Sequence, residues 1–229
     1  MKRLVSCIYA PVFLFGFIGC GFWQPHALIL LFVIAVAVSF LAEQWLPYEP
    51  QWNCSLGDRR RDTVHALVNE SLNALGLLIL PGLTALFAFE GLWPRGWPLW
   101  QQLLMAIVLG IPLDVAQLLA LAIALQLLLQ HSNVDMRLGP LRWVFAWAPV
   151  HRFHHMKYGH AGDVNFGLFF NLWDWLLGTA FYREGYRMGA GDLGIGSRPD
   201  FPVGYGAQLR DPFRPVALSK EPSLPDELR

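Results

Sequence analysis

Two long apolar runs near the start of the chain constrain its fold more than any other feature. They extend from Leu4 to Trp23 and from Ala27 to Ala42, with only Gln24-Pro25-His26 between them. Each run is close to the roughly 20 residues that an apolar helix needs to cross a bilayer. A signal peptide is the alternative, because Lys2 and Arg3 precede the first run. No small-residue cleavage site separates the runs cleanly, so we expect a transmembrane helical hairpin.

Composition supports a membrane protein over a soluble domain. Hydrophobic residues make up 55% of the chain and charged residues 15%, whereas charged residues are about 25% of an ordinary soluble domain. Ten tryptophans and sixteen phenylalanines point the same way, because aromatic side chains collect at membrane interfaces. The net charge is zero, so charge gives no argument for a nucleic-acid partner.

Further apolar segments predict about four transmembrane helices in all. A third segment runs from about Leu72 to Leu92 and is interrupted by Pro81-Gly82, where a kink is expected. A fourth extends from Leu99 to Leu129, which is 31 residues. As one helix it would be roughly 46 Å long, against a hydrocarbon core of about 30 Å. It is too long for one span and too short for two spans and a turn.

The charged loops orient the chain in the membrane. Basic residues favour the cytoplasmic side, so Lys2, Arg3 and Arg59-Arg60-Arg61 place the N-terminus and the loop before residue 62 in the cytoplasm. We therefore expect an all-α integral membrane protein with a cytoplasmic, histidine-rich helical cap and an irregular C-terminal tail. Residues 1–229 are expected to form one membrane domain, which divides into a hairpin and loop (1–62), membrane helices (63–130), a histidine-rich region (131–187) and a Gly- and Pro-rich tail (188–229).

Four of the seven histidines lie in one short stretch, HRFHHMKYGHAGDVNFG, at residues 151–167. Three of them, His151, His154 and His155, have the spacing H-x-x-H-H, which places their side chains on one face of a helix. Imidazole is a good ligand for iron, zinc and copper, and a metal binds its neutral form. The alternative is a set of interfacial histidines solvated beside lipid headgroups.

Other residues extend this candidate metal site. His131 lies where the long apolar run ends, near the membrane surface that the 151–155 segment also occupies, and we expect it to be a fourth ligand. His160 is a looser candidate, five residues past His155. Asp163 and Asn165 are expected to orient the ligand rings, as carboxylates and amides commonly do.

The remaining residues that can bind metals have structural interpretations. His65 lies alone near a predicted helix start, and His26 lies in the turn of the first hairpin. Cys7, Cys20 and Cys54 have no metal-binding spacing and are expected to be small apolar fillers. The sequence contains neither a phosphate-binding G-x-x-x-x-G-K loop nor an H-E-x-x-H zinc-protease motif.

The second half of the chain contains an ordered series of motifs, namely QHSNV (130–134), GPLRW (139–143), HRFHH (151–155), NFG (165–167) and LWDWLLGT (172–179). This series strongly resembles the C-terminal half of the fatty acid hydroxylase/sterol desaturase superfamily. Upstream, EQWLP (43–47) and RDTVHALVN (61–69) also resemble bacterial members. An ordered set of this kind is far more specific than H-x-x-H-H alone.

The resemblance implies a membrane-embedded, cytoplasm-facing centre that normally holds two iron ions. Such a centre activates dioxygen to hydroxylate or desaturate a C–H bond of a lipid or sterol, with electrons from a separate donor protein. At the matching positions it implies that His131, His151, His154 and His155 are metal ligands. It implies that Asn165 and Asp174 are supporting residues.

The chain departs from the family pattern in one place. The family carries two further histidine boxes upstream of QHSNV, whereas no histidine lies between His65 and His131 here. Asp114-Val115-Ala116-Gln117 is followed directly by an apolar run. Two segments that run in the same direction would then be joined, with a kink at Pro112, a strong tilt, or part of the run outside the hydrocarbon.

About half of the expected ligands are therefore missing, and at most one well-ligated iron ion is expected. The sequence predicts a membrane-bound, iron-dependent oxygenase of this type with impaired activity. Two alternatives stay open. One is a non-catalytic family member that binds a lipid or a partner, and the other is a protein with a mononuclear structural metal site.

Overall fold

The computed structural model describes residues 2–55, 57–87, 96–109, 112–158, 162–215 and 218–228. It divides into two compact units, one formed by residues 1–55 together with 121–229 and the other by residues 56–120. The described residues form α-helices, 3-10 turns and three isolated β-bridges, with no strand among them. The prediction of an all-helical protein is therefore confirmed for this part of the chain.

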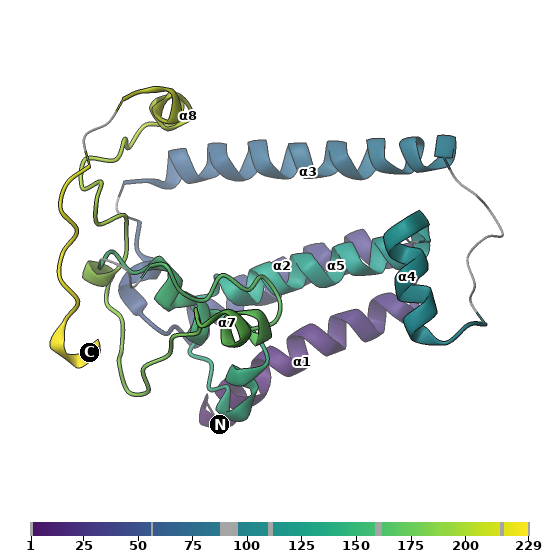
Figure 1. Cartoon of the computed structure of the whole chain (residues 1–229), viewed down its shortest axis with the longest axis horizontal. Coiled ribbons are helices and arrows are strands. Elements are labelled where there is room, and N and C mark those ends of the chain that lie inside the picture. Colours follow the sequence, from purple (N-terminus) through teal and green to yellow (C-terminus); the bar gives the residue numbers. More distant parts are fainter. Residues whose placement is uncertain are drawn as a thin grey trace. The chain divides into compact units, whose positions relative to one another are not determined.

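The predicted N-terminal hairpin is present in the first unit. Helix α1 (Lys2–Trp23) and helix α2 (Leu28–Trp45) pack against each other and are joined by the short 3-10 turn η1 (Pro25–Ala27) (Figure 1). Many of their apolar side chains are exposed, including Leu4, Phe15 and Ile29. Among the described residues, these two helices alone are long and apolar enough to cross a membrane. The structure thus supports two of the four predicted spans.

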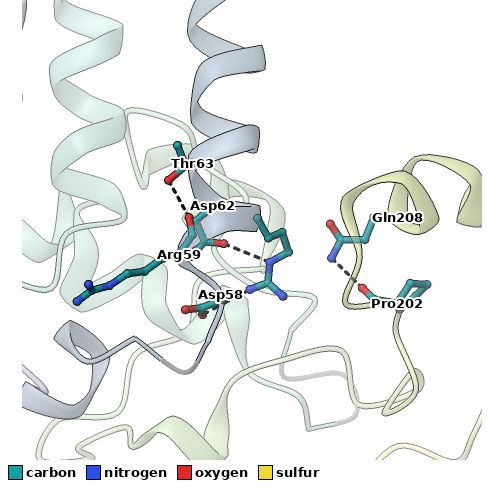
Figure 2. Close-up of polar contacts among 7 residues, drawn as sticks. Asp58, Arg59, Asp62, Thr63, Pro202 and Gln208 are labelled. Carbon is teal, nitrogen blue, oxygen red and sulfur yellow. Dashed lines mark hydrogen bonds and ion pairs between the residues drawn. The ribbon is translucent and has the colours of Figure 1, made fainter.

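The second unit begins with a helix that starts earlier than the sequence suggested. Helix α3 (Arg59–Phe87) includes the basic residues that we had assigned to a loop, and it continues through Pro81. Arg61 pairs with Asp58 and Asp62, and the Thr63 hydroxyl donates to the Arg59 carbonyl oxygen at 2.7 Å (Figure 2). A carboxylate in the first turn is favoured by the positive end of the helix dipole, so the charged residues belong to the helix start.

The long apolar run from Leu99 to Leu129 forms two helices and not one. Helix α4 (Leu99–Leu109) is followed by helix α5 (Leu113–Gln130), which begins directly after Pro112. Proline is well tolerated at a helix start, because it lacks an N–H that would otherwise be unpaired there. A kink at Pro112 was one of the three arrangements expected for this run, and the structure has a helix boundary at that residue.

In the first unit, the QHSNV segment pairs with the chain that leaves α2. Pro47 and Val134 form an antiparallel bridge, and the Asp135 amide donates to the Leu46 carbonyl oxygen at 2.9 Å. The Asn133 side chain accepts from the Glu49 amide and donates to the Glu49 carbonyl oxygen. These bonds fix the position of the segment that carries His131.

The histidine-rich region consists of short helical turns. They are η3 (Gly139–Trp143), α6 (Ala148–His151), η4 (Arg152–His155) and α7 (Leu172–Leu177). The three histidines of H-x-x-H-H lie on one continuous helical stretch, which is α-helical up to His151 and a 3-10 turn from Arg152 to His155. A proline at the start of α6 sets its first turn.

The C-terminal tail is irregular, as predicted, but it packs on the histidine segment. Its turns are η5 (Ala190–Asp192), α8 (Tyr205–Arg210), η6 (Asp211–Phe213) and η7 (Asp226–Leu228). Met188 and Leu228 are buried together with Phe153 and Met156. The Gly194 amide also donates to the His155 carbonyl oxygen at 3.1 Å, so the tail supports the backbone of η4.

Candidate metal centre

Four histidines from three segments of the chain converge in the first unit. His131 follows the last residue of α5, His151 ends α6, and His154 and His155 end η4. The ring centroid of His151 lies 4.9 Å from that of His131, 4.8 Å from that of His155 and 5.1 Å from that of His154. The structure therefore brings together all four of these predicted ligands.

The ring nitrogens are spaced to suit one metal ion. One nitrogen each from His131, His151 and His155 lies within 4.8 Å of the others, and the closest pair, Nε2 of His151 and Nε2 of His155, is 3.1 Å apart. Metal–nitrogen bonds of about 2.0–2.1 Å place two ligands on one ion at most about 4 Å apart. Small movements of the rings bring the three nitrogens within that range. No second group of metal-ligating side chains occurs in the part of the chain that the structure describes.

Backbone carbonyl groups orient two of the rings. His154 Nδ1 lies 2.8 Å from the Val164 carbonyl oxygen, and His131 Nδ1 lies 3.2 Å from the Leu127 carbonyl oxygen. An Nδ1–H that donates to a carbonyl group leaves Nε2 free as the ligand atom, which is the usual arrangement of histidines in metal sites. Both rings are thus prepared to bind through Nε2.

Burial and mutual repulsion keep the central rings neutral. His151 is only 7% exposed, and its burial together with the neighbouring His155, His131 and His154 lowers its pKa to about 3. Burial and the nearby His131 and His154 lower the pKa of His155 to about 4. Since only neutral imidazole coordinates a metal, both rings are in their binding form at neutral pH.

A buried hydrogen-bond relay reaches His151 from α7. The Gln130 amide nitrogen donates to the Gly167 carbonyl oxygen at 3.0 Å and lies 3.1 Å from Nδ1 of His151. The Gly167 amide in turn donates to Asp174 Oδ2 at 2.9 Å. A Cβ at Gly167 would lie 2.5 Å from the Phe170 carbonyl oxygen, so the relay requires glycine at this position. Gln130 therefore holds the His151 ring in place from the Nδ1 side, and Nε2 faces His155.

Asp174 and Asn165 support the site through the backbone and not through the rings. Asp174 is 2% exposed and also accepts from the Phe166 amide at 2.7 Å and from the Thr179 hydroxyl at 2.8 Å. Asn165 donates to the Val150 carbonyl oxygen at 2.9 Å, directly before His151. Hydrogen bonds therefore join the NFG motif to the LWDWLLGT motif. Together the two motifs support the backbone next to His151.

The other predicted site residues have different outcomes. Asp163 is exposed, and no hydrogen bond joins its carboxylate to a histidine that the structure describes. His160 lies outside the described residues. His65 lies on α3 in the second unit, and His26 lies in η1. The three cysteines are free and exposed, so they do not fill core gaps as the sequence suggested.

Sequence reasoning missed the buried residues that assemble the centre. Arg152 is buried, and its Nη2 donates to the carbonyl oxygens of Ser132 and Val134 at 2.9 and 3.0 Å, which joins the two histidine segments. Its guanidinium lies 3.8 Å from the centre of the Tyr48 ring. Gln126 and Gln130 are the buried polar residues of α5 among those that the structure describes. Burying an amide side chain costs free energy unless the amide is hydrogen-bonded. A glutamine within an apolar segment was therefore the sequence signal that could have identified these two residues.

Comparisons with known proteins agree with the residues that form the centre. Residues 82–179 match the family model described as fatty acid hydroxylase, and this range includes all four converging histidines. An ornithine lipid hydroxylase, OlsE of Rhizobium tropici, is 38% identical over 119 residues, which cover 50% of this chain and 35% of the relative. The chain thus spans about a third of that relative's length. No solved structure matches. Through this segment, the chain is similar to the fatty acid hydroxylase family.

Proposed function

We propose that this chain is a membrane-bound, iron-dependent oxygenase that hydroxylates or desaturates a C–H bond of a lipid or sterol with dioxygen. The observation that carries the proposal is the convergence of His131, His151 and His155, whose ring nitrogens lie within 4.8 Å of one another. In this proposal those three histidines and His154 hold the iron ion, and His160 is a further candidate. The bound ion supplies dioxygen activation, and a separate protein supplies the electrons.

The chain's own residues prepare the ligands and leave one side of the site open. Burial and the neighbouring rings keep His151 neutral, while Gln130 holds its Nδ1 and Arg152 joins its segment to that of His131. His131 and His155 are exposed and His151 is buried. In this proposal, the substrate approaches from the side of His131 and His155. The hydrogen-bonded turn around Asp174, next to His151, keeps its conformation.

The same proposal includes one metal ion per chain and impaired turnover. Residues 66–130 contain no histidine, whereas the family resemblance implies ligands for a second ion there. A dinuclear site needs protein ligands for both ions and open positions for the reactants. We further propose a single membrane domain over residues 1–229, with about four spans and with the N-terminus and the histidine region in the cytoplasm.

Product analysis in cells tests this function. The relative's name identifies an ornithine lipid as the class of molecule on which that protein acts, so ornithine lipids are the first substrates to supply, followed by phospholipids and sterols. Expression of the chain should yield a small amount of lipid that has gained one oxygen atom or lost two hydrogen atoms, as measured by mass spectrometry. The product should disappear in His151→Ala and persist in His65→Ala.

The second candidate is a non-catalytic protein with a structural metal ion. The absence of histidine from residues 66–130 favours it. It predicts zinc in the purified protein and identical lipid profiles for the wild type and His151→Ala. That pair of results would contradict the oxygenase proposal.

A further inference from the structure

A small pocket in the first unit lies between η3, α7 and the segment 180–184. Its cavity volume is about 290 Å³, and its walls include Arg142, Trp143, Trp175, Tyr182 and Glu184. Pockets for drug-sized molecules start at about 300 Å³, so the space suits a compact polar group and not an acyl chain. None of the candidate metal ligands lines it.

Two residues that line the pocket have a buried polar atom without a hydrogen-bond partner. These atoms are Nε of Arg142 and Oδ1 of Asn171. An unpaired buried donor or acceptor costs about 1–3 kcal/mol. The guanidinium of Arg142 is partly exposed, with 26% of the side chain accessible, so its terminal nitrogens can reach a ligand in the cavity.

The charged groups and aromatic rings that line the pocket suit a zwitterionic ligand. The Arg142 guanidinium carbon lies 5.4 Å from the Trp143 ring centre and 5.2 Å from that of Tyr182. Glu184 lies 3.4 Å from Arg142 and its side chain is 78% exposed, so it is free to turn towards a cation. Guanidinium groups bind phosphate or carboxylate, and aromatic faces with a carboxylate bind ammonium groups.

Helix α7 lies beside the pocket. It buries its polar residue and exposes its apolar residues, which is the reverse of the pattern in a soluble protein. Asp174 is its only polar residue and its only buried one. Its apolar side chains are all exposed, namely Leu172, Trp173, Trp175, Leu176 and Leu177. A contiguous exposed apolar patch marks a membrane or partner contact, and tryptophan favours the interface between hydrocarbon and water. With α7 at the membrane interface, the mouth of the pocket would lie at the depth of lipid headgroups.

We propose that this pocket binds the zwitterionic headgroup of a membrane lipid. Arg142 takes the anionic group, and Glu184 with Trp175 takes the ammonium group. Phe153, between His151 and His154, packs against Phe181 and Tyr182 with ring centroids 5.4 and 5.7 Å apart, so the pocket wall adjoins the histidine segment.

This inference does not rest on the proposed oxidation, because binding at the pocket requires no metal. The test uses the full chain in detergent and measures binding of three short-chain probes. These are dihexanoyl phosphatidylcholine, dihexanoyl phosphatidylglycerol and dihexanoylglycerol, and glycerophosphocholine is a fourth probe without acyl chains. We expect the phosphatidylcholine to bind at least tenfold more tightly than dihexanoylglycerol and than glycerophosphocholine. Equal binding of glycerophosphocholine would indicate a soluble zwitterion as ligand and would overturn the assignment to a lipid.

Two variants locate the binding in the pocket. Arg142→Gln should weaken the phosphatidylcholine probe at least tenfold, whereas Arg137→Gln, at an exposed position outside the pocket, should not. Glu184→Gln changes an exposed side chain and so preserves folding. It should weaken phosphatidylcholine several-fold and leave phosphatidylglycerol unchanged. Wild-type binding in both pocket variants, or equal loss of both phospholipids in Glu184→Gln, would contradict the proposal.

Discussion

The two units of this chain are both rich in apolar helix but differ in what their side chains contact. The unit formed by residues 1–55 and 121–229 buries side chains such as Leu125, Trp147 and Asp174. Within residues 56–120, no described side chain is buried, and Leu72 and Leu103 are exposed. The four converging histidines and their hydrogen-bond partners, as far as the structure describes them, lie in the first unit.

One of the two boundaries between the units falls within α5. The second unit ends at Ala120 and the first resumes at Leu121. At Asp114–Leu121 the family resemblance led us to expect a histidine box that the sequence lacks. Substitutions in the two units test whether the first unit alone determines the site.

The largest effect on stability is expected at Asp174. Asp174→Ala leaves the buried amides of Phe166 and Gly167 and the Thr179 hydroxyl without their acceptor, which should cost about 3–5 kcal/mol of unfolding free energy. Chemical denaturation in detergent measures it. Asp163→Ala, at an exposed position, is the control and should change the stability by less than about 0.5 kcal/mol. Equal effects would show that the turn below the histidines does not depend on this carboxylate.

A pair of leucine substitutions tests the comparison directly. Leu125 is 0% exposed in the first unit, and Leu103 is 57% exposed in the second. Leu125→Ala should cost about 2–5 kcal/mol because it opens a cavity in packed protein. Leu103→Ala should cost less than about 1 kcal/mol. Similar losses at both positions, measured by the same denaturation, would contradict the difference between the units.

Substitutions of Gln130 and Gln126 form a matched pair that tests which buried glutamine controls metal affinity. Gln130→Met removes the contact to His151 Nδ1 and the bond to Gly167, and should weaken Co²⁺ binding about 10–100-fold. Gln126→Met removes bonds to Trp147 and Leu168, and should lower stability while the affinity for Co²⁺ stays near that of the wild type. Visible absorption of the bound Co²⁺ measures both. Unchanged affinity in Gln130→Met would exclude the relay as a determinant of the site.

The smallest effect is the pH dependence of the metal-free protein. The pKa of His151 is about 3 when folded and about 6.5 in the unfolded chain, so between these values only the unfolded chain binds the proton. Stability should therefore fall as the pH decreases below about 6.5, with His151 contributing about 1–2 kcal/mol between pH 7 and pH 5. The loss should be smaller in His151→Gln. A wild-type stability that is constant from pH 7 to pH 5 would contradict the burial of a neutral ring.

Patterns local in sequence were predictable, and contacts between distant segments were not. The apolar runs predicted the α1–α2 hairpin, and the spacing of His151, His154 and His155 predicted that their rings lie together. The role of Gln130 depends on Gly167, 37 residues away, and that of Arg152 on carbonyl groups 18 and 20 residues away. No spacing rule links such pairs. The packing of Met188 and Leu228 on Phe153 could not be predicted from the sequence for the same reason.

The metal content of the purified full chain tests the central claim most directly. The protein is expressed with iron, purified in detergent without chelators, and analysed by inductively coupled plasma mass spectrometry. The first unit offers one converging set of imidazoles, so we predict close to one iron per chain, and less than about a tenth of that in His151→Ala. Close to two irons per chain, or the same iron content in His151→Ala, would contradict the claim that these histidines hold a single ion.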